Sequence, residues 1–337
     1  MTLRHIFIND VGRLRSGWRL VIFVLTYVVL FYLITTLVRV AYALGNLLFP
    51  NATLHANLQD LVFRIILVVS SLLAAYLCTR WLEGLPWRAI GLWLHARWFR
   101  DLLIGSAIGI ASLALAAGIA AAAGGLRFSV SSSGMFPQVA KTLILSGGLF
   151  IVAALAEEAL FRGYALQTLA RARLAWLGVL LTSVPFAAVH LDNPNAGPLS
   201  SINTALAGVW LGVAYLRTRS LWFPLGVHWA WNWALGSLFG LPVSGITRLA
   251  PNPLLRGIDL GPAWLTGGSY GIEGGLACTI ALVISTIFIW RTRLVSATEE
   301  MVRLTSEEVS SSKVSLSSDP EAHIEYPSYR RIQRAGG

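Results

Sequence analysis

Two adjacent carboxylates and one guanidinium lie inside one of the most apolar stretches of the 337-residue chain. In the segment AALAEEALFR, Glu157, Glu158 and Arg162 stand where lipid or packed helix should surround them. A charge near the centre of a bilayer costs at least ~2.5 kcal/mol, so such residues indicate a functional site. His190 in PFAAVHL and His228 in GVHWAWN follow in similarly apolar surroundings.

These residue types are sufficient in kind for hydrolysis of an amide. A carboxylate surrounded by apolar groups is a stronger base than one in water, and it can take a proton from a water molecule. One histidine can orient that water, while the other histidine and an amide such as Asn232 donate hydrogen bonds to the developing oxyanion. Glu157, His190 and His228 are also a zinc ligand set in kind. However, no HExxH helix is present, so the sequence requires no metal or other cofactor.

Helical spacing separates the tasks of the two carboxylates. Glu158 and Arg162 are four residues apart, so they share a helix face and can form an ion pair. Glu157 is rotated from Glu158 by about 100° and cannot face Arg162 equally. We therefore expect Glu158 and Arg162 to be a supporting pair, and Glu157 to point into a cavity.

Two further motifs repeat the four-residue spacing, Phe186 with His190 and His228 with Asn232. Three helices would then each present a polar group on a defined face. A rise of 1.5 Å per residue puts Glu157 about 19 Å, His190 about 24 Å and His228 about 12 Å from the predicted cytoplasmic helix ends. The groups are expected to meet near mid-membrane, in a site opening toward the cytoplasm.

The composition places the chain in the membrane class. Hydrophobic residues make up 55% and charged residues 12% of the chain, and the mean hydropathy is +0.66. Soluble domains carry roughly 25% charged residues. The net charge of +10 is compatible with nucleic-acid binding, but the arginines cluster in alternate loops as the positive-inside rule describes. We therefore expect a lipid bilayer and no nucleic acid as the partner of these charges.

The elements that must position the motifs are eight predicted spans, so the fold class is an all-α polytopic membrane helix bundle with both termini cytoplasmic. The spans are predicted at 18–43, 59–82, 101–125, 139–170, 174–191, 200–217, 221–240 and 273–291. Three parts follow: a cytoplasmic N-terminal segment 1–17, a transmembrane bundle 18–291, and a tail 292–337 that is rich in Ser and Glu and expected to be disordered. No signal-peptide cleavage pattern is present, so the first helix is expected to be retained.

Two connecting segments have compositions of their own. Residues 84–100 mix Trp, Leu and Arg at helical spacing, which fits either an interfacial amphipathic helix or an ordinary loop with aromatic residues at the interface. Residues 241–272 are rich in Gly and Pro and are predicted to be an outer loop.

Three motifs in order, each in a hydrophobic segment, resemble a known family. EEALFR has the form EExxxR, FAAVH has FxxxH, and HWAWN has HxxxN. They resemble the CPBP family of intramembrane proteases, which includes the type II CAAX prenyl endopeptidases and bacterial proteins labelled as abortive-infection or bacteriocin-processing. The resemblance covers 139–240, and TGGSYGIEGG at 266–275 also looks like sequence found in bacterial members.

The resemblance implies an eight-helix membrane endopeptidase with roles for the motif residues. Glu157 would activate water, His190 would help to hold that water, and His228 with Asn232 would form the oxyanion hole. Glu158, Arg162 and Phe186 would be supporting residues. Members have been described both as metalloproteases and as metal-free glutamate proteases. The resemblance leaves both mechanisms open.

The function expected from the sequence is hydrolysis of a peptide bond in a membrane-associated or prenylated substrate. Two other classes stay open. One is a catalytically silent membrane scaffold that keeps the fold, and the other is a proton-coupled transporter, against which the lack of an internal repeat counts. The chain has few lysines and many arginines and alanines. This bias points to a bacterial plasma membrane as its location.

Overall fold

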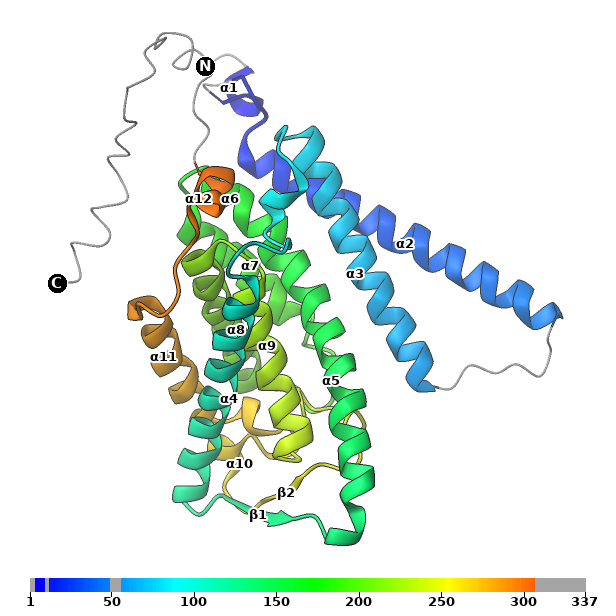
Figure 1. The fold of residues 1–337 in the computed structure, drawn as a ribbon, viewed down its shortest axis with the longest axis vertical. Coiled ribbons are helices and arrows are strands. Elements are labelled where there is room, and N and C mark those ends of the chain that lie inside the picture. The colour runs from blue at the N-terminus through cyan, green and yellow to red at the C-terminus, as the bar shows by residue number, and fades with distance from the viewer. Residues whose placement is uncertain (1–3, 10–11, 49–55, 307–337) are drawn as a thin grey trace.

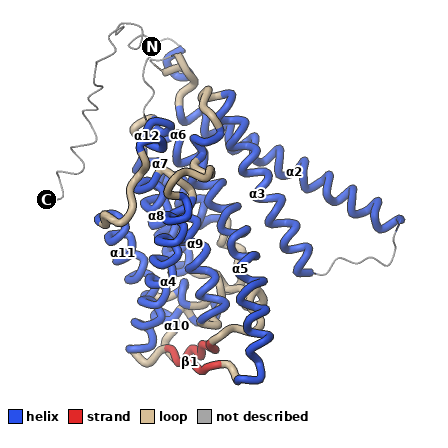
Figure 2. Tube along the Cα trace, viewed as in Figure 1, coloured by secondary structure: helices blue, strands red, loops and turns tan. Residues whose placement is uncertain are grey.

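The computed structural model describes residues 4–9, 12–48 and 56–306, and these residues are mainly helical (Figures 1 and 2). A helix or helical run lies at each of the eight predicted spans. They are α2 (Ser16–Leu48), α3 (Ala56–Trp81), α4 (Trp98–Ala122), α5 (Phe136–Glu158) continued by η3 (Ala159–Leu166) and α6 (Gln167–Arg171), α7 (Ala175–Ala188), α8 (Pro198–Thr218), α9 (Trp222–Trp233) continued by η4 (Ala234–Leu238), and α11 (Leu276–Arg291).

Five helical runs in the described part of the chain are long and apolar enough to cross a membrane. They are Ser16–Leu47, Leu58–Trp81, Trp98–Ala122, Phe136–Arg171 and Pro198–Thr218. Helices α7 and α11 are equally apolar but shorter, with 14 and 16 residues. The chain is therefore an integral membrane protein with several membrane-spanning helices.

Helices α4, α5, α7, α8, α9 and α11 stand together as a bundle, while α2 and α3 meet it near one end and slant away from it, α2 the most (Figure 1). Helices α4 and α9 approach each other closely, and this approach depends on glycine. A Cβ on Gly109 would lie 2.3 Å from the carbonyl oxygen of Val227, and one on Gly226 would lie 2.3 Å from that of Leu102. Only residues without a side chain allow this contact, as is common between membrane helices.

The helices that carry EExxxR and HxxxN change their winding within the first motif and just after the second. The α-helix α5 ends at Glu158 and continues as the π-helical segment η3, which contains Arg162. Likewise α9, which contains His228, passes into the π-helical segment η4. Such π segments are rare and occur frequently at functional sites. Residue spacing at 3.6 per turn describes a regular α-helix and does not predict these π segments.

Helix α8 has clear start and stop signals. Pro198 stands in its first turn, where a missing N–H costs nothing, and Ser200 Oγ accepts a hydrogen bond from the backbone N–H of Gly197 at 2.8 Å. Arg219 follows the helix in the left-handed conformation with φ 54°. These signals fix the ends of the helix that packs between α7 and α11.

A small sheet at one end of the bundle was not predicted. Strands β1 (Leu126–Val130) and β2 (Leu255–Asp259) pair antiparallel, with Phe128 opposite Gly257. Segment 241–272, predicted to be a loop, also contains the short helix α10 (Ala263–Thr266) and the one-turn helix η5 (Gly268–Tyr270), and η6 (Ile272–Gly274) follows. Alternation over five residues between Gly- and Pro-rich flanks is too short a signal to separate a strand from a loop.

The amphipathic-helix interpretation of residues 84–100 is wrong, and the loop alternative fits. Only η1 (Trp87–Ile90) is helical before α4 begins, and it is a single 3-10 turn. Ala89, Ile90 and His95 are buried in the protein rather than presented to an interface. Their burial shows that the segment packs against the bundle end.

The prediction of disorder from residue 292 does not hold for residues 292–306. Helix α12 (Glu299–Thr305) begins at an N-cap, where Thr298 Oγ1 accepts from the N–H of Met301 at 3.2 Å. Met301 is buried, and the indole N–H of Trp93 donates to its sulfur at 3.2 Å. The remainder of the predicted tail, like part of the predicted N-terminal segment 1–17, lies outside the described residues. Within that N-terminal segment α1 (Arg4–Phe7) is helical.

Candidate active site

Glu158, the last residue of α5, is the centre of a buried polar cluster. Its Oε1 accepts a hydrogen bond from Arg162 Nη1 at 3.0 Å and lies 2.9 Å from His228 Nδ1. Arg162 Nη2 also donates to the carbonyl oxygen of Gly208 on α8 at 3.2 Å. The side chains of Glu158 and Arg162 are fully buried. The ion pair expected from the spacing is present, and the same carboxylate also holds His228.

Glu157 differs from Glu158 in its exposure and its partners. Its side chain is 27% exposed, and its Oε2 lies 3.7 Å from His228 Nε2. That oxygen is buried and has no hydrogen-bond partner among the described residues. Glu157 therefore has an acceptor oxygen without a hydrogen bond, and its side chain does not line the pocket that His228 reaches.

His228 connects the two carboxylates from the middle of α9. Its Nδ1 faces Glu158 and its Nε2 faces Glu157. The side chain is 9% exposed. Asn232, one turn further along the same helix, lines a pocket that His228 also reaches. The spacing HxxxN thus places both side chains of this motif at the same pocket.

Phe186 packs the aromatic side of the cluster. Its ring centroid lies 4.4 Å from the guanidinium carbon of Arg162, a distance at which cation–π attraction operates. The ring also packs edge-on against Phe161 at 5.4 Å and His228 at 6.1 Å. It therefore covers the ion pair from the pocket side and contacts three other members of the site.

His190 lies just beyond the end of α7 and not on its face, because the helix ends at Ala188. Its Nδ1 is 2.7 Å from the carbonyl oxygen of Phe186. When the ring is neutral, this contact puts the proton on Nδ1 and leaves the lone pair of Nε2 available. The four-residue spacing therefore brings His190 into contact with Phe186, but through the backbone carbonyl in the last turn of the helix and not on a shared helix face.

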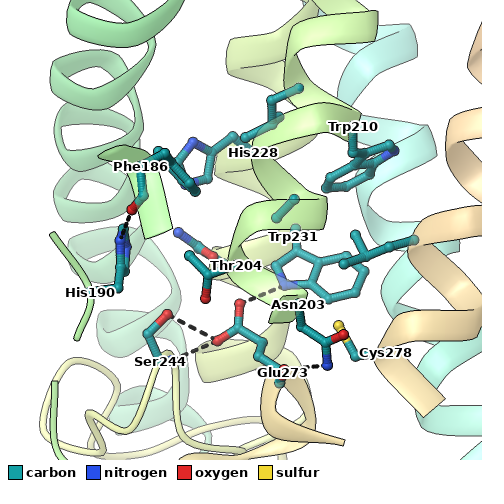
Figure 3. A pocket seen from close by; sticks show the side chains of 14 residues that line it. Phe186, His190, Asn203, Thr204, Trp210, His228, Trp231, Ser244, Glu273 and Cys278 are labelled. Carbon is teal, nitrogen blue, oxygen red and sulfur yellow. Dashed lines mark hydrogen bonds between the residues drawn. The ribbon is translucent and has the colours of Figure 1, made fainter. Parts of the chain in front are cut away.

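A pocket with about 490 Å³ of empty space, its open mouth included, brings several of these residues together (Figure 3). Four residues of the predicted site contribute to its wall: Phe186, His190, His228 and Asn232. The other lining residues are Asn203, Thr204, Ala207, Trp210, Leu211, Trp231, Ser244, Glu273, Cys278 and Leu282. Glu157 and Glu158 are not in this wall and reach it through His228.

The position of the pocket differs from the expected opening toward the arginine-rich, cytoplasmic end. Asn203 and Thr204 stand in the first two turns of α8, while Ser244 lies in the loop before β2 and Glu273 in η6, after α10. The charge bias assigns these segments to the outer side. Depths counted along straight helices do not hold here, because His190 stands beyond the end of α7 and Glu273, the first residue of the predicted span 273–291, lies in η6 before α11 begins.

Glu273 is a pocket residue that the sequence analysis did not select. Its Oε1 accepts from the indole N–H of Trp231 at 3.0 Å, and its Oε2 accepts from the backbone N–H of Ser244 at 2.6 Å. The signal was available, because Glu273 is the acidic residue of the segment TGGSYGIEGG, which was noticed only for its resemblance.

Arg64 on α3 is a second residue that the sequence left without a role. It lies close enough to Glu157 for their charges to interact, and also to Asp60 and Arg248, which form an ion pair at 3.0 Å. Positive charge thus approaches Glu157 from α3 as well as from Arg162. Nothing in the spacing of α3 could have related it to a carboxylate on a helix some 90 residues away.

The structure does not gather a metal-binding set. Among the described residues, no three His, Cys, Asp or Glu side chains come together as ligands for a metal ion. The set named from the sequence, Glu157, His190 and His228, is therefore not gathered around one point. Without a rearrangement, these residues do not fit a zinc site.

The core of the chain is similar to a known protein family. Residues 138–234 match the family described as type II CAAX prenyl endopeptidase Rce1-like, which confirms the resemblance seen in the three motifs. An uncharacterised 24.3 kDa protein from Escherichia coli is 38% identical over 107 residues, which cover 31% of this chain and 46% of that protein. The chain thus spans a little under half the length of this relative. No solved structure matches the chain.

Proposed function

Because residues 138–234 belong to the Rce1-like family of type II CAAX prenyl endopeptidases, we propose that the protein is an intramembrane endopeptidase. It hydrolyses a peptide bond of a membrane-associated or prenylated substrate. Glu157 is the general base, His190 holds the attacking water, and His228 with Asn232 binds the oxyanion. The observation that carries the proposal is the position of His228 between the two carboxylates, with Oε2 of Glu157 left without a hydrogen bond among the described residues.

The reaction would begin with the water molecule. Oε2 of Glu157 takes a proton from it while the water oxygen attacks the carbonyl carbon of the scissile bond. His190 accepts a hydrogen bond from the water through Nε2, because its Nδ1–H is held by the carbonyl of Phe186. The proton on Glu157 then passes to the leaving nitrogen, and the C–N bond breaks to give a carboxylic acid and an amine.

The negative charge that develops on the carbonyl oxygen needs fixed donors. The side-chain amide of Asn232 supplies one. In its doubly protonated form, His228 donates from Nδ1 to Glu158 and offers Nε2–H to the oxyanion. The charges of Glu157, Glu158, Arg162 and His228 then sum to zero, so the cluster can stay in an apolar environment.

The proposal also includes how the chain crosses the membrane. The eight helical runs each cross the bilayer, both termini are cytoplasmic, and the membrane is a bacterial plasma membrane. The shorter runs α7 and α11 are supported by their apolar composition and their packing against α8. Labelling of single cysteines introduced into each loop, with an impermeant reagent, tests this arrangement.

The activity is tested by cleavage of a library of membrane peptides, prenylated and plain, by purified protein in detergent. Glu157→Ala is expected to abolish cleavage while the protein keeps its fold. The matched control is Glu299→Ala, since the Glu299 side chain is 92% exposed and remote from the pocket. Equal cleavage by wild type and Glu157→Ala would overturn the proposal. No cleavage by the wild type would favour a silent scaffold.

Metal dependence is a separate arm of the same experiment. The mechanism above uses only side chains of this chain, so cleavage is expected to continue in the presence of a chelator. Loss of cleavage with chelator and its return with zinc would instead support a metalloprotease. That result would require the candidate ligands to gather around the ion in the active protein, which they do not do among the described residues.

A further inference from the structure

The pocket has a carboxylate at the end away from Glu157 that carries no counter-charge. Glu273 makes no ion pair among the described residues, and no Lys or Arg lines the pocket with it. Its partners are all neutral donors, the indole of Trp231 and the N–H and hydroxyl of Ser244. A half-buried charge with only neutral partners favours a cation brought by another molecule.

The carboxylate is held in place before any ligand arrives. Asn203 Nδ2 donates to the backbone oxygen of Glu273 at 2.8 Å and to that of Gly275 at 2.9 Å. Thr279 Oγ1 in turn donates to Asn203 Oδ1 at 2.6 Å. Three donors occupy the side chain of Glu273, and a carboxylate has about four acceptor positions, so one remains on Oε1.

The aromatic side chains that line the pocket beside Glu273 also favour a cationic group. Trp210 and Trp231 line the pocket with their ring centroids 5.5 Å apart (Figure 3). Both indole N–H groups are already bonded, to Ser285 Oγ at 2.8 Å and to Glu273. Both side chains are almost fully buried, so they add only the small ring area that lines the pocket, and aromatic faces attract ammonium and guanidinium groups.

We propose that Glu273 determines the substrate specificity of this pocket, by receiving the cationic side chain of a lysine or arginine next to the scissile bond. The inference rests on the proposed function, because the same pocket contains His190, His228 and Asn232. The reacting carbonyl would lie at the histidine end and the cationic side chain would extend toward Glu273. The substrate class is therefore a membrane-associated peptide with a basic residue beside the cleaved bond.

The test compares peptides that differ only in charge at that position. Arginine is replaced by citrulline, its neutral isostere, and lysine by norleucine, on either side of the scissile bond. Wild-type protein is expected to cleave the charged peptides with a kcat/KM at least tenfold higher, as hydrogen bonds to charged groups suggest. Glu273→Gln is expected to remove this preference while still cleaving the neutral peptides. Equal rates for charged and neutral peptides with the wild type would overturn the proposal.

A binding arm separates this proposal from the proposed hydrolysis. Glu157→Ala protein in nanodiscs is titrated with the arginine and citrulline peptides, and binding is followed by tryptophan fluorescence. Tighter binding of the arginine peptide, lost in the Glu157→Ala/Glu273→Gln double variant, supports the cationic site even if no peptide is cleaved. Equal binding of both peptides contradicts it. In Glu273→Gln, the side-chain NH₂ would face a donor of Trp231 or Ser244, because only one of its two terminal atoms can accept. If this variant does not fold, the comparison of charged and neutral peptides with the wild-type protein decides the question.

Discussion

His228 Nδ1 lies 2.9 Å from Oε1 of Glu158, the same oxygen that accepts from Arg162. The carboxylate next to the proposed base therefore does more than balance the charge of an arginine. It fixes the orientation of the imidazole and so decides which nitrogen faces Glu157. Of the two neighbouring glutamates, Glu158 thus positions His228, whereas Glu157 is the proposed base.

Replacement of the two glutamates should affect stability and activity differently. Glu158→Ala leaves Arg162 buried with no carboxylate, which costs about 3–5 kcal/mol of stability. Glu157→Ala removes a partly exposed carboxylate whose contact with Nε2 of His228 is 3.7 Å, so the stability loss should be smaller than that of Glu158→Ala. The rate of cleavage should fall by about 10²- to 10⁴-fold in Glu157→Ala, the usual contribution of a general base. Thermal unfolding in detergent and cleavage rates measure both effects.

The control for this comparison is Glu157→Gln, which keeps the shape of the side chain. It should unfold at the wild-type temperature and remain inactive. A marked loss of stability in either variant at position 157, or full stability in Glu158→Ala, would contradict the division of roles.

A double-mutant cycle should show that Glu158 and Arg162 stabilise each other. Arg162→Met alone leaves the carboxylate of Glu158 buried with only His228 as a partner, and should destabilise the protein by several kcal/mol. The double variant Glu158→Gln/Arg162→Met removes both charges and should be more stable than either single variant. The coupling is expected to be about 1–3 kcal/mol, measured from unfolding in detergent. Additive losses would show that the pair is not coupled.

The sequence predicted the positions of the long helices, but not their changes of winding or the small elements between and after them. Long apolar runs located every helical run in the bundle, because burial in lipid demands them and few other structures satisfy the backbone there. The turn to π-helix after Glu158 and the β1–β2 pair were not foreseen, since neither follows from hydrophobicity. The packing of α12 was missed because its single buried apolar anchor, Met301, stands in a charged segment.

The sequence predicted the contacts of the candidate site that lie within one helix, but not those between helices. Glu158 and Arg162 lie on one helix, so their contact follows from local geometry. The contact of His228 with Glu158 depends on how α9 packs against α5, which spacing alone does not determine. Glu273 and Arg64 carry no helical pattern relating them to the motifs, and only the fold brings them to the pocket and to Glu157.

The glycine contact between α4 and α9 should control the position of His228. Gly226→Ala would put a Cβ 2.3 Å from the carbonyl oxygen of Leu102, so the two helices must move apart. We expect a loss of cleavage together with a stability loss of about 1–3 kcal/mol, typical of overpacking. Gly118→Ala on α4 is the matched control, because a Cβ there meets nothing within 4 Å. It should be neutral or slightly stabilising. Wild-type activity in Gly226→Ala would show that the close approach does not position the site.

Glu83 should hold α2 to the bundle from a place remote from the pocket. Its carboxylate is fully buried, pairs with Arg19 of α2 at 3.4 Å, and bonds Thr168 and Arg171 of α6. Glu83→Ala leaves two buried arginines without this carboxylate, so we expect a loss of about 3–5 kcal/mol and faster proteolysis between α2 and α3.

The exposed pair Arg88–Glu300, with side chains 53% and 46% exposed, provides the control. Glu300→Ala should change stability by less than about 1 kcal/mol, because an ion pair in contact with water gains little. Both variants should cleave substrate normally at a temperature where they are folded, since neither residue lines the pocket. Equal unfolding temperatures for the two variants would show that Glu83 does not hold α2 to the bundle.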